Sequence, residues 1–236
     1  MVRPKSRRRK SISEKKVHVA MTTTSLQDQL DEITANTRKL VQAERLAIGE
    51  RAVEELFASE IEDRILPVGA LAPEFALRDS SGKLVRSADL LAVGPLVIKF
   101  FRGRWCSYCV TELETYRDLY GQIREQGGLL VAISPETQRQ SDFAVQQHGL
   151  AYPLLHDPEA KVAEQFGLVY TVPEYHQKYL KSILVNLPFL NGEASWRLPL
   201  PATYGIGRDG RVIFAEAHAD FRVRPEPREV ISALLG

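Results

Sequence analysis

Residues 100–109 of this chain read FFRGRWCSYC. They follow a largely apolar run from Leu96 that predicts a buried strand, and they lead into a helical pattern that begins at residues 110–113. Cys106 and Cys109 are the only cysteines, so all thiols stand at one strand-to-helix junction. The unpaired N–H groups and the dipole of a helix N-terminus favour a thiolate, which is the reactive form. The segment therefore predicts a reactive dithiol.

The composition sets the class of protein. The chain has 236 residues and a hydrophobic content of 44%, which is enough for one large core with appendages. Two cysteines are too few for a disulfide-stapled secreted scaffold. No apolar run approaches the ~18 residues of a membrane helix, and no apolar segment follows the N-terminal charges as in a signal peptide. We therefore expect a cytoplasmic protein that does not enter a membrane.

The N-terminal charges are concentrated. Residues 1–20 carry eight basic side chains and one acidic one, whereas the chain as a whole has a formal net charge of +1, so the remainder is mildly acidic. This composition predicts a disordered basic tail over residues 1–24 rather than a nucleic-acid-binding element. Met21 is an alternative start, in which case residues 1–20 are not part of the native protein.

Residues 25–66 predict a helical arm. Their apolar residues recur at helical spacing, Ser25 is suited to cap the first helix, and Gly49 is a candidate break between two helices. The arm shows no chemistry of its own. It is expected to pack on the body of the protein or on a second subunit, which is consistent with a homodimer.

Residues 67–236 predict one α/β domain in which strands alternate with helices and a hairpin and a helix end the chain. A hairpin is expected around the turn at residues 79–82, and another around residues 208–210. Residues 169–197 look like an insertion or lid without regular elements. Further strands are expected at 96–101, 128–134, 152–155 and 202–206, and helices at 111–125, 138–148, 159–166 and 227–235.

The cysteines and a late proline carry a resemblance. The chain resembles the thioredoxin fold in three features, namely a buried strand, the Trp105-Cys106-x-x-Cys109 motif that follows it, and a later Pro201-Ala202-Thr203. In that family a cis proline lies against the C-x-x-C pair and shapes the substrate cleft. The resemblance implies an α/β fold of three layers, in which helices flank a central mixed sheet, here with an N-terminal helical extension.

Other motifs over residues 67–235 resemble peroxiredoxins of the alkyl-hydroperoxide-reductase and thiol-specific-antioxidant group, in the branch that contains C-x-x-C. Residues 72–75 (APEF) match the opening strand of these proteins, residues 109–113 (CVTEL) match the start of the peroxidatic helix, and residues 132–134 (AIS) match a strand end.

Two positions depart from ordinary peroxiredoxins. Their peroxidatic cysteine is preceded three residues earlier by Thr or Ser, and here that residue is Cys106. Their late-strand arginine is replaced by Pro201. Arg102 or Arg104 is then expected to supply the positive charge, with Trp105 in the cleft wall and Thr203 as a further supporting residue.

The roles of the two cysteines stay open at this level. The peroxiredoxin resemblance makes Cys109 the attacking sulfur and Cys106 the resolving one, whereas thioredoxin logic reverses them. Glu112, three residues after Cys109, is either a proton acceptor or a carboxylate that stabilises the first helical turn.

The resemblance implies a thiol-dependent peroxidase that reduces hydrogen peroxide or organic hydroperoxides. Its electrons would come from a thioredoxin-like protein or a low-molecular-weight thiol. The alternatives are a protein-disulfide oxidoreductase and a redox-sensing interaction module without peroxidase activity. The five histidines are scattered without the short spacing of a zinc site, so we expect no metal and no other cofactor.

Overall fold

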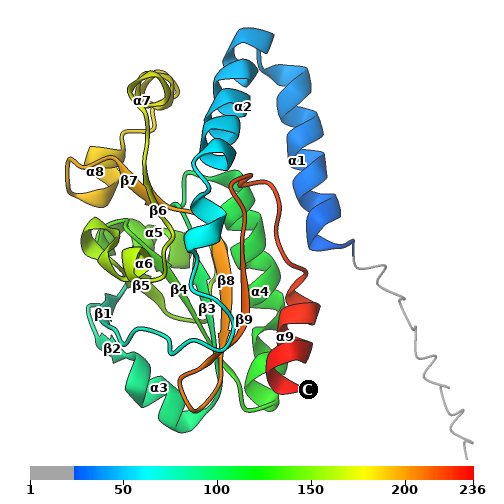
Figure 1. Cartoon of the computed structure of the whole chain (residues 1–236), viewed down its shortest axis with the longest axis vertical. Helices are drawn as coiled ribbons and strands as arrows, with labels where there is room; N and C mark the ends of the chain where they lie inside the picture. The colour runs from blue at the N-terminus through cyan, green and yellow to red at the C-terminus, as the bar shows by residue number, and fades with distance from the viewer. Residues whose placement is uncertain (1–23) are drawn as a thin grey trace, which may run out of the picture.

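A computed structural model describes residues 24–236, so the tail expected over residues 1–24 lies outside it except for Thr24. The centre of the fold is a seven-stranded sheet in the order β2-β1-β5-β4-β3-β8-β9 (Figure 1). The strands of this sheet are β1 (Ala76–Asp79), β2 (Leu84–Arg86), β3 (Leu96–Phe100), β4 (Leu129–Ser134), β5 (Leu154–His156), β8 (Ala202–Ile206) and β9 (Val212–Ala217).

The sheet is mixed, as the resemblance implied. The strands β3, β4 and β5 run parallel, while β8 is antiparallel to β3, β9 to β8, and β1 to β5. In the register, Phe100 of β3 lies opposite Ile133 of β4 and Ala202 of β8. Every residue of β3 is buried, which explains why its sequence is apolar with little alternation except at Lys99.

Helices cover both faces of the sheet. Alternate residues of β3 point to opposite sides, so Ile98 and Phe100 join one core and Val97 joins the other. The first core includes residues of η1, α3 and α6, and the second includes residues of α4, α5 and α9. These helices are η1 (Ile61–Arg64), α3 (Ser87–Val93), α4 (Ser107–Glu125), α5 (Gln138–His148), α6 (Lys161–Gln165, preceded by η2, Pro158–Ala160) and α9 (Pro227–Leu235). The three-layer fold is confirmed.

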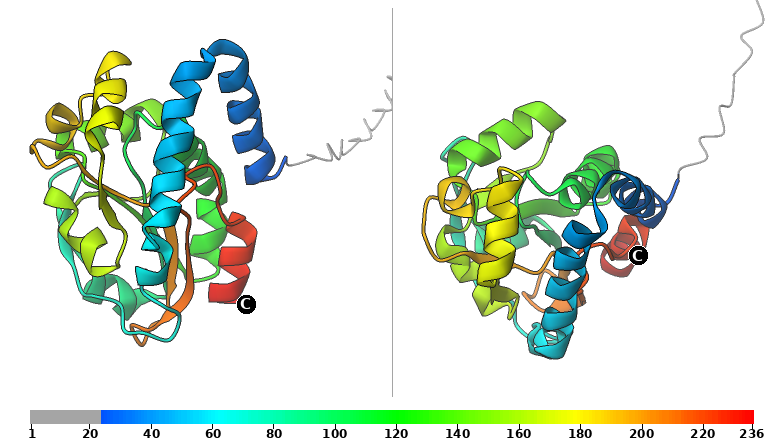
Figure 2. Two further views of the ribbon diagram at one scale, coloured as in Figure 1. Left: turned by 45° about the horizontal axis from the view of Figure 1, so that its top comes forward. Right: turned by 90° about the horizontal axis from the view of Figure 1, so that it is seen from above.

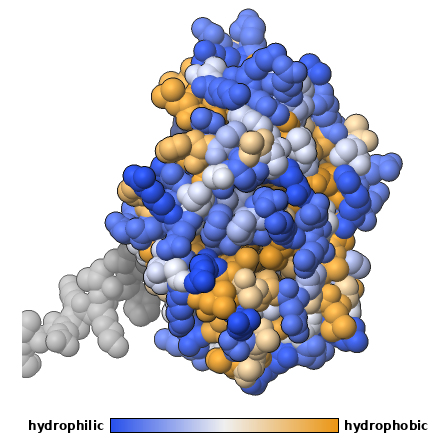
Figure 3. All heavy atoms as spheres, turned by 90° about the vertical axis from the view of Figure 1, so that its left-hand side faces the viewer, coloured by the Kyte–Doolittle hydropathy of each residue, from blue (hydrophilic) through white to orange (hydrophobic). Residues whose placement is uncertain are grey.

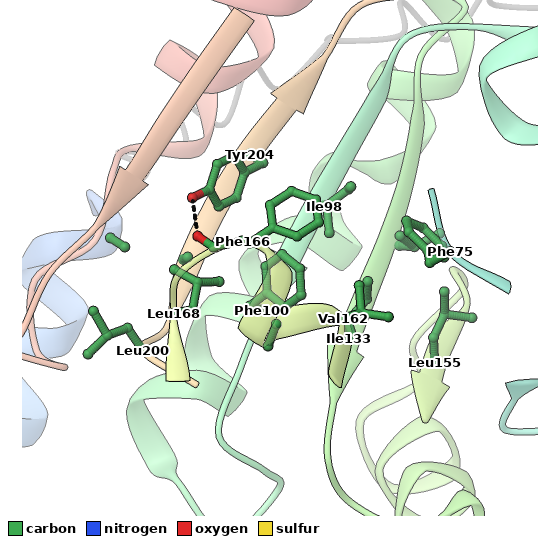
Figure 4. Packing of buried hydrophobic residues seen from close by; sticks show 14 of the residues in the cluster. Phe75, Ile98, Phe100, Ile133, Leu155, Val162, Phe166, Leu168, Leu200 and Tyr204 are labelled. Atoms are coloured by element: carbon green, nitrogen blue, oxygen red, sulfur yellow. Dashed lines mark hydrogen bonds between the residues drawn. The ribbon is translucent and has the colours of Figure 1, made fainter. Parts of the chain in front are cut away.

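Aromatic rings pack at the centre of the first core (Figure 4). The rings of Phe100 and Phe166 have centroids 4.9 Å apart, and Tyr204 meets Phe166 edge-on at the same distance. The Tyr204 hydroxyl donates to the carbonyl of Phe166 at 3.4 Å. This packing fixes the end of β3, from which the cysteine loop leaves the sheet.

Most of the predicted arm forms two helices, α1 (Leu26–Leu40) and α2 (Ala43–Ala58), that stand as a pair above the sheet (Figures 1 and 2). The end of the arm forms η1, which packs in the first core. Ser25 caps α1 as expected, through a bond to Asp28. The Glu226 carboxylate, next to α9, also accepts the N–H groups of Leu26 and Gln27 at 3.2 and 3.0 Å. The helices separate at residues 41–42, so the break expected at Gly49 is wrong, and Gly49 lies inside α2. Packing tolerates a glycine within a helix although its propensity is low.

Residues 169–197 contain regular elements, which corrects the expectation of an irregular insertion. They form β6 (Val169–Thr171), α7 (Glu174–Ser182), α8 (Leu187–Asn191) and β7 (Arg197–Pro199), and β6 pairs with β7 in a small sheet of its own. Short elements of this kind give little periodic signal, and their own core around Leu180, Leu187 and Trp196 is visible only in three dimensions.

The face that carries α7 and α8 is largely hydrophilic, with hydrophobic residues in separate groups (Figure 3). Within residues 24–236, none of the helices combines the length and the apolar character that crossing a membrane requires. The division into a tail, an arm and a domain over residues 67–236 stays a prediction, as does the homodimer.

Candidate active site

The C-x-x-C pair lies at the start of α4. Cys106 is the N-cap residue, and its Sγ accepts a hydrogen bond from the backbone N–H of Cys109 at 3.3 Å. A side-chain oxygen usually fills this role at a helix N-terminus, so the sulfur of Cys106 replaces a hydroxyl group. Both thiols are free and buried. A thiolate at position 106 accepts this bond more strongly than a thiol, because a charged acceptor strengthens a hydrogen bond.

Of the two candidate arginines, Arg102 contacts the cysteine pair. Its Nη2 donates to the Sγ of Cys106 at 3.1 Å, and its guanidinium carbon lies 3.9 Å from the ring centre of Phe221. Arg102 is only 6% exposed, so water screens its charge little. Arg104 points elsewhere, because its Nε donates to Gln140 at 2.7 Å. The positive charge at the sulfur therefore comes from Arg102.

These contacts separate the two thiols electrostatically. Burial by itself raises the pKa of the Cys106 thiol, but the hydrogen bonds from Cys109 and Arg102 and the guanidinium charge outweigh it and lower that pKa to about 5. Burial and the neighbouring thiolate raise the pKa of Cys109 well above its ordinary value. These contacts therefore favour the thiolate at Cys106 and the thiol at Cys109.

A buried charged network lies beneath the pair. Glu112 accepts hydrogen bonds from Lys99 Nζ of β3 and, at 3.0 Å, from Arg224 Nε of the segment before α9. The Lys99 ammonium also bonds Thr203 of β8. The side chains of Lys99, Glu112 and Arg224 are at most 1% exposed. Glu112 therefore lies between two cations, and both of its carboxylate oxygens take part.

A cavity of about 200 Å³ reaches one of the two cysteines, and we call it the cysteine cavity. It lies between the start of α4, the arm and α7, and Tyr108 in its wall hydrogen-bonds Thr34 of α1 at 3.0 Å. Cys109 is not part of its lining. Cys106 is, but this residue is only 3% exposed, so access to its sulfur is narrow. The wall includes Arg102, Trp105, Cys106, Tyr108, His176 and Tyr179.

A family model described as AhpC/TSA family matches residues 68–215. The chain belongs to the AhpC/TSA family. The resemblance inferred from the motifs is thereby confirmed, and the protein is a thiol-dependent oxidoreductase of this family.

Curated relatives of this AhpC/TSA protein fall into two groups. It is 26% identical over 152 residues to the thiol-disulfide oxidoreductase ResA of Bacillus anthracis, which covers 63% of this chain and 68% of ResA. It is 25% identical over 115 residues to the peroxiredoxin Bcp of Bacillus subtilis, covering 49% of this chain and 73% of Bcp. Similarity alone therefore does not separate a peroxide from a disulfide as the substrate.

Solved structures agree on the fold. The peroxidoxin BcpB of Mycobacterium tuberculosis matches with a TM-score of 0.57 and 22% identity, over 72% of this chain and 96% of that protein. A mutant of PrxQ from Xylella fastidiosa matches with a TM-score of 0.55 and 16% identity, over 72% and 93%. The match leaves about a quarter of this AhpC/TSA chain without a counterpart.

The other candidate residues lie in the cavity wall, before β8 and in the charged network. Trp105 lines the cysteine cavity, as expected for a cleft wall. Pro201 is buried directly before β8, but among the described residues every peptide bond is trans, which corrects the cis bond that the resemblance implied. The trans form is the more stable one for a bond to proline. Thr203 meets Lys99 in the network rather than the cavity.

Sequence reasoning missed four residues around this AhpC/TSA site. Lys99 could have been identified from the sequence, since a charge inside the apolar run of a strand needs a buried partner. Glu136 could also have been identified, because it follows a buried strand whose end lies beside that of β3. His176 and Arg224 could not, because they lie far along the chain and only the tertiary fold brings them here.

Proposed function

We propose that this protein is a dithiol peroxidase in which Cys106 attacks the peroxide and Cys109 resolves the product. The observation that carries the proposal is the position of Cys106, whose sulfur bonds Arg102 at 3.1 Å and lines the cysteine cavity. The lowered pKa of Cys106, about 5, supports a thiolate at neutral pH. This order of roles is the one that thioredoxin logic suggested.

The chemistry balances with these two residues. The Cys106 thiolate attacks the terminal oxygen of a hydroperoxide, and the O–O bond breaks, which gives a sulfenic acid and an alkoxide or hydroxide that takes a proton from water. The Cys109 thiol then attacks the sulfenic sulfur, so that a disulfide and a water molecule form. A thiol donor supplies two electrons and two protons, and restores both cysteines.

Arg102 suits this first step because its guanidinium donates to the sulfur and lies where negative charge moves from sulfur to oxygen. The size of the cysteine cavity supports a small acceptor. A peroxide fits into about 200 Å³, whereas a disulfide on a folded protein does not reach a cysteine that is 3% exposed unless the arm moves away.

The test follows thiol oxidation in three proteins, namely the wild type, Cys106→Ser and Cys109→Ser. With a slight excess of peroxide, the wild type is expected to lose both thiols much faster than free cysteine does. Cys109→Ser should accumulate a sulfenic acid at Cys106, which dimedone traps for mass spectrometry. Fast oxidation that survives in Cys106→Ser would reverse the proposed roles.

A protein-disulfide oxidoreductase is the second candidate. It is favoured by the low pKa of the first cysteine of the pair and by the similarity to ResA. In that activity the Cys106 thiolate attacks a substrate disulfide, and Cys109 releases the mixed disulfide. Insulin reduction by the same three proteins distinguishes the candidates. Rapid turnover of insulin together with peroxide oxidation no faster than that of free cysteine would support the second one.

A further inference from the structure

A second cavity, of about 360 Å³, adjoins the site, and we call it the α2 cavity. Its walls come from α2, from β6 and from the start of α7, and α7 lies beside α2 (Figure 2). Tyr175 of α7 joins these helices through a hydrogen bond to Glu55 of α2 at 2.8 Å. Apolar or aromatic side chains make up much of the lining, namely Ala52, Val53, Leu56, Val169, Tyr170 and Pro173.

The two cavities share part of their walls. Arg102, His176 and Phe221 line both of them. Arg102 also donates to the Cys106 sulfur at 3.1 Å, so the same side chain contacts that sulfur and lines the α2 cavity. A molecule that extends from the cysteine cavity past this guanidinium therefore enters a larger and mostly apolar space.

Polar atoms without a partner lie at this shared wall. Within residues 24–236, Nε of Arg102 and Nδ1 of His176 are buried and have no hydrogen-bond partner. Burial and the charge of Arg102 lower the pKa of His176 to about 4, so its imidazole is neutral at physiological pH. A buried polar group without a partner is costly, so each of these two atoms is a candidate for a hydrogen bond to a ligand oxygen.

We propose that the α2 cavity binds the apolar part of an organic hydroperoxide while its peroxide oxygens lie at Arg102 and Cys106. This inference rests on the proposed peroxidase function and adds the substrate preference and its structural source. Ligand pockets usually measure about 300–1,000 Å³ and are mostly apolar with a few polar groups, and the α2 cavity fits that description. Hydrogen peroxide gains nothing from this space, whereas an aryl or branched alkyl group buries its surface there.

The helix α2 is the source of the preference. It lies outside residues 68–215, over which the AhpC/TSA model matches, so the arm adds this pocket to a common domain. The bound group contacts Val53 and Leu56 of α2 and Val169 of β6, which line the cavity. The alcohol product leaves by the same route after the O–O bond has broken.

The experiment measures kcat/KM for cumene hydroperoxide and for hydrogen peroxide, and uses their ratio. Leu56→Trp fills the α2 cavity, and Phe57→Trp is the matched control, because Phe57 is the next residue of α2 and is 53% exposed. The ratio of the two constants should fall at least tenfold in Leu56→Trp and stay at the wild-type value in Phe57→Trp. The ratio does not depend on the fraction of protein that is folded.

The outcomes separate the two proposals. A wild type that reduces both peroxides, with a ratio unchanged by Leu56→Trp, overturns the α2 cavity as a substrate site and leaves the peroxidase function standing. If Leu56→Trp lowers kcat/KM equally for both peroxides, the ratio is also unchanged and the α2 cavity is again excluded as a substrate site. A wild type whose thiols react with neither peroxide faster than free cysteine does removes the peroxidase function, and the inference with it.

Discussion

At the scale of the residue, the contact between Arg102 and Cys106 is the most consequential one in the site. Arg102→Met removes the hydrogen bond and the charge, so the pKa of Cys106 should rise from about 5 toward the ordinary thiol value of ~8.5. Once the pKa exceeds the working pH, each further increase of one pKa unit reduces the thiolate fraction tenfold. Alkylation of Cys106 by iodoacetamide near neutral pH should therefore slow at least tenfold.

The alkylation rate is measured as a function of pH in a Cys109→Ser background, so that only one thiol reacts. Arg104→Met is the control, because the Arg104 side chain bonds Gln140 and not the sulfur. If both arginine variants shift the pH profile of alkylation equally, the specific role given to Arg102 is wrong.

Glu136 is the second residue with a measurable electrostatic consequence. It is fully buried behind the cysteine loop, and its Oε2 accepts the N–H of Arg104 at 2.8 Å. Gly103 has a positive φ and leaves room for this carboxyl, since a Cβ there would lie 2.8 Å from Oε1 of Glu136. Burial raises the pKa of Glu136 from 4.5 to about 7.

The raised pKa of Glu136 makes the folded protein less stable as the pH increases. Below about pH 4.5 the carboxyl is protonated in both the folded and the unfolded state, and between there and about pH 7 only the unfolded state ionises. The free energy of unfolding should therefore fall by on the order of 3 kcal/mol as the pH rises through this window. Urea unfolding at about pH 5 and pH 8 should show this loss in the wild type beyond that in Glu136→Gln. If the free energy of unfolding changes equally with pH in the wild type and in Glu136→Gln, this role of Glu136 is contradicted.

At the scale of the element, α1 covers the site through a small apolar contact. Leu26 and Leu30 are at most 1% exposed and belong to the same core as residues of α4. Leu30→Ala should destabilise this contact by about 2–5 kcal/mol. We expect faster hydrogen exchange in α1 and faster alkylation of Cys106. Leu40→Ala is the matched control, since Leu40 lies on the same helix and is 85% exposed. If Leu30→Ala and Leu40→Ala change the alkylation rate equally, α1 does not limit access to Cys106.

Elements differed in how well the sequence predicted them. The helices at 138–148 and 227–235 have the predicted bounds, because their apolar spacing and flanking residues agree. The α4 helix begins at Ser107 and not at Thr111, since the sulfur of Cys106 serves as a cap that no propensity scale includes. Residues 169–197 were misjudged because short elements depend on tertiary contacts.

At the scale of the whole molecule, the buried network joins distant parts of the chain. Glu112→Gln leaves Lys99 and Arg224 buried without an anion, and such a loss typically costs about 3–5 kcal/mol. Chemical unfolding should show a decrease of this order. The control is Glu114→Gln on the same helix, whose side chain is 39% exposed and whose pairing should contribute less than about 1 kcal/mol. Similar losses in both variants would contradict the buried role.

The separation of interacting residues along the chain limits what a sequence predicts about a site. Cys106, Cys109 and Arg102 lie within eight residues, and local spacing was enough to bring them together in the prediction. Arg224 is 112 positions from its partner Glu112, and His176 reaches the site from the separate β6–β7 unit. Nothing in a single sequence records such a contact, so the charged network and the α2 cavity required the structure.

The hydrogen bonds between the Glu226 carboxylate and the start of α1 also affect the order of events in folding. Leu26 and Glu226 are 200 positions apart, so forming their bond closes nearly the whole chain into a loop, and contacts of high sequence separation form slowly. During synthesis α1 emerges well before the carboxylate that holds it. We therefore expect the arm to dock last in folding, after the cysteines already stand on a formed helix. Pulsed alkylation during refolding should find Cys106 open for an interval before α1 binds Glu226.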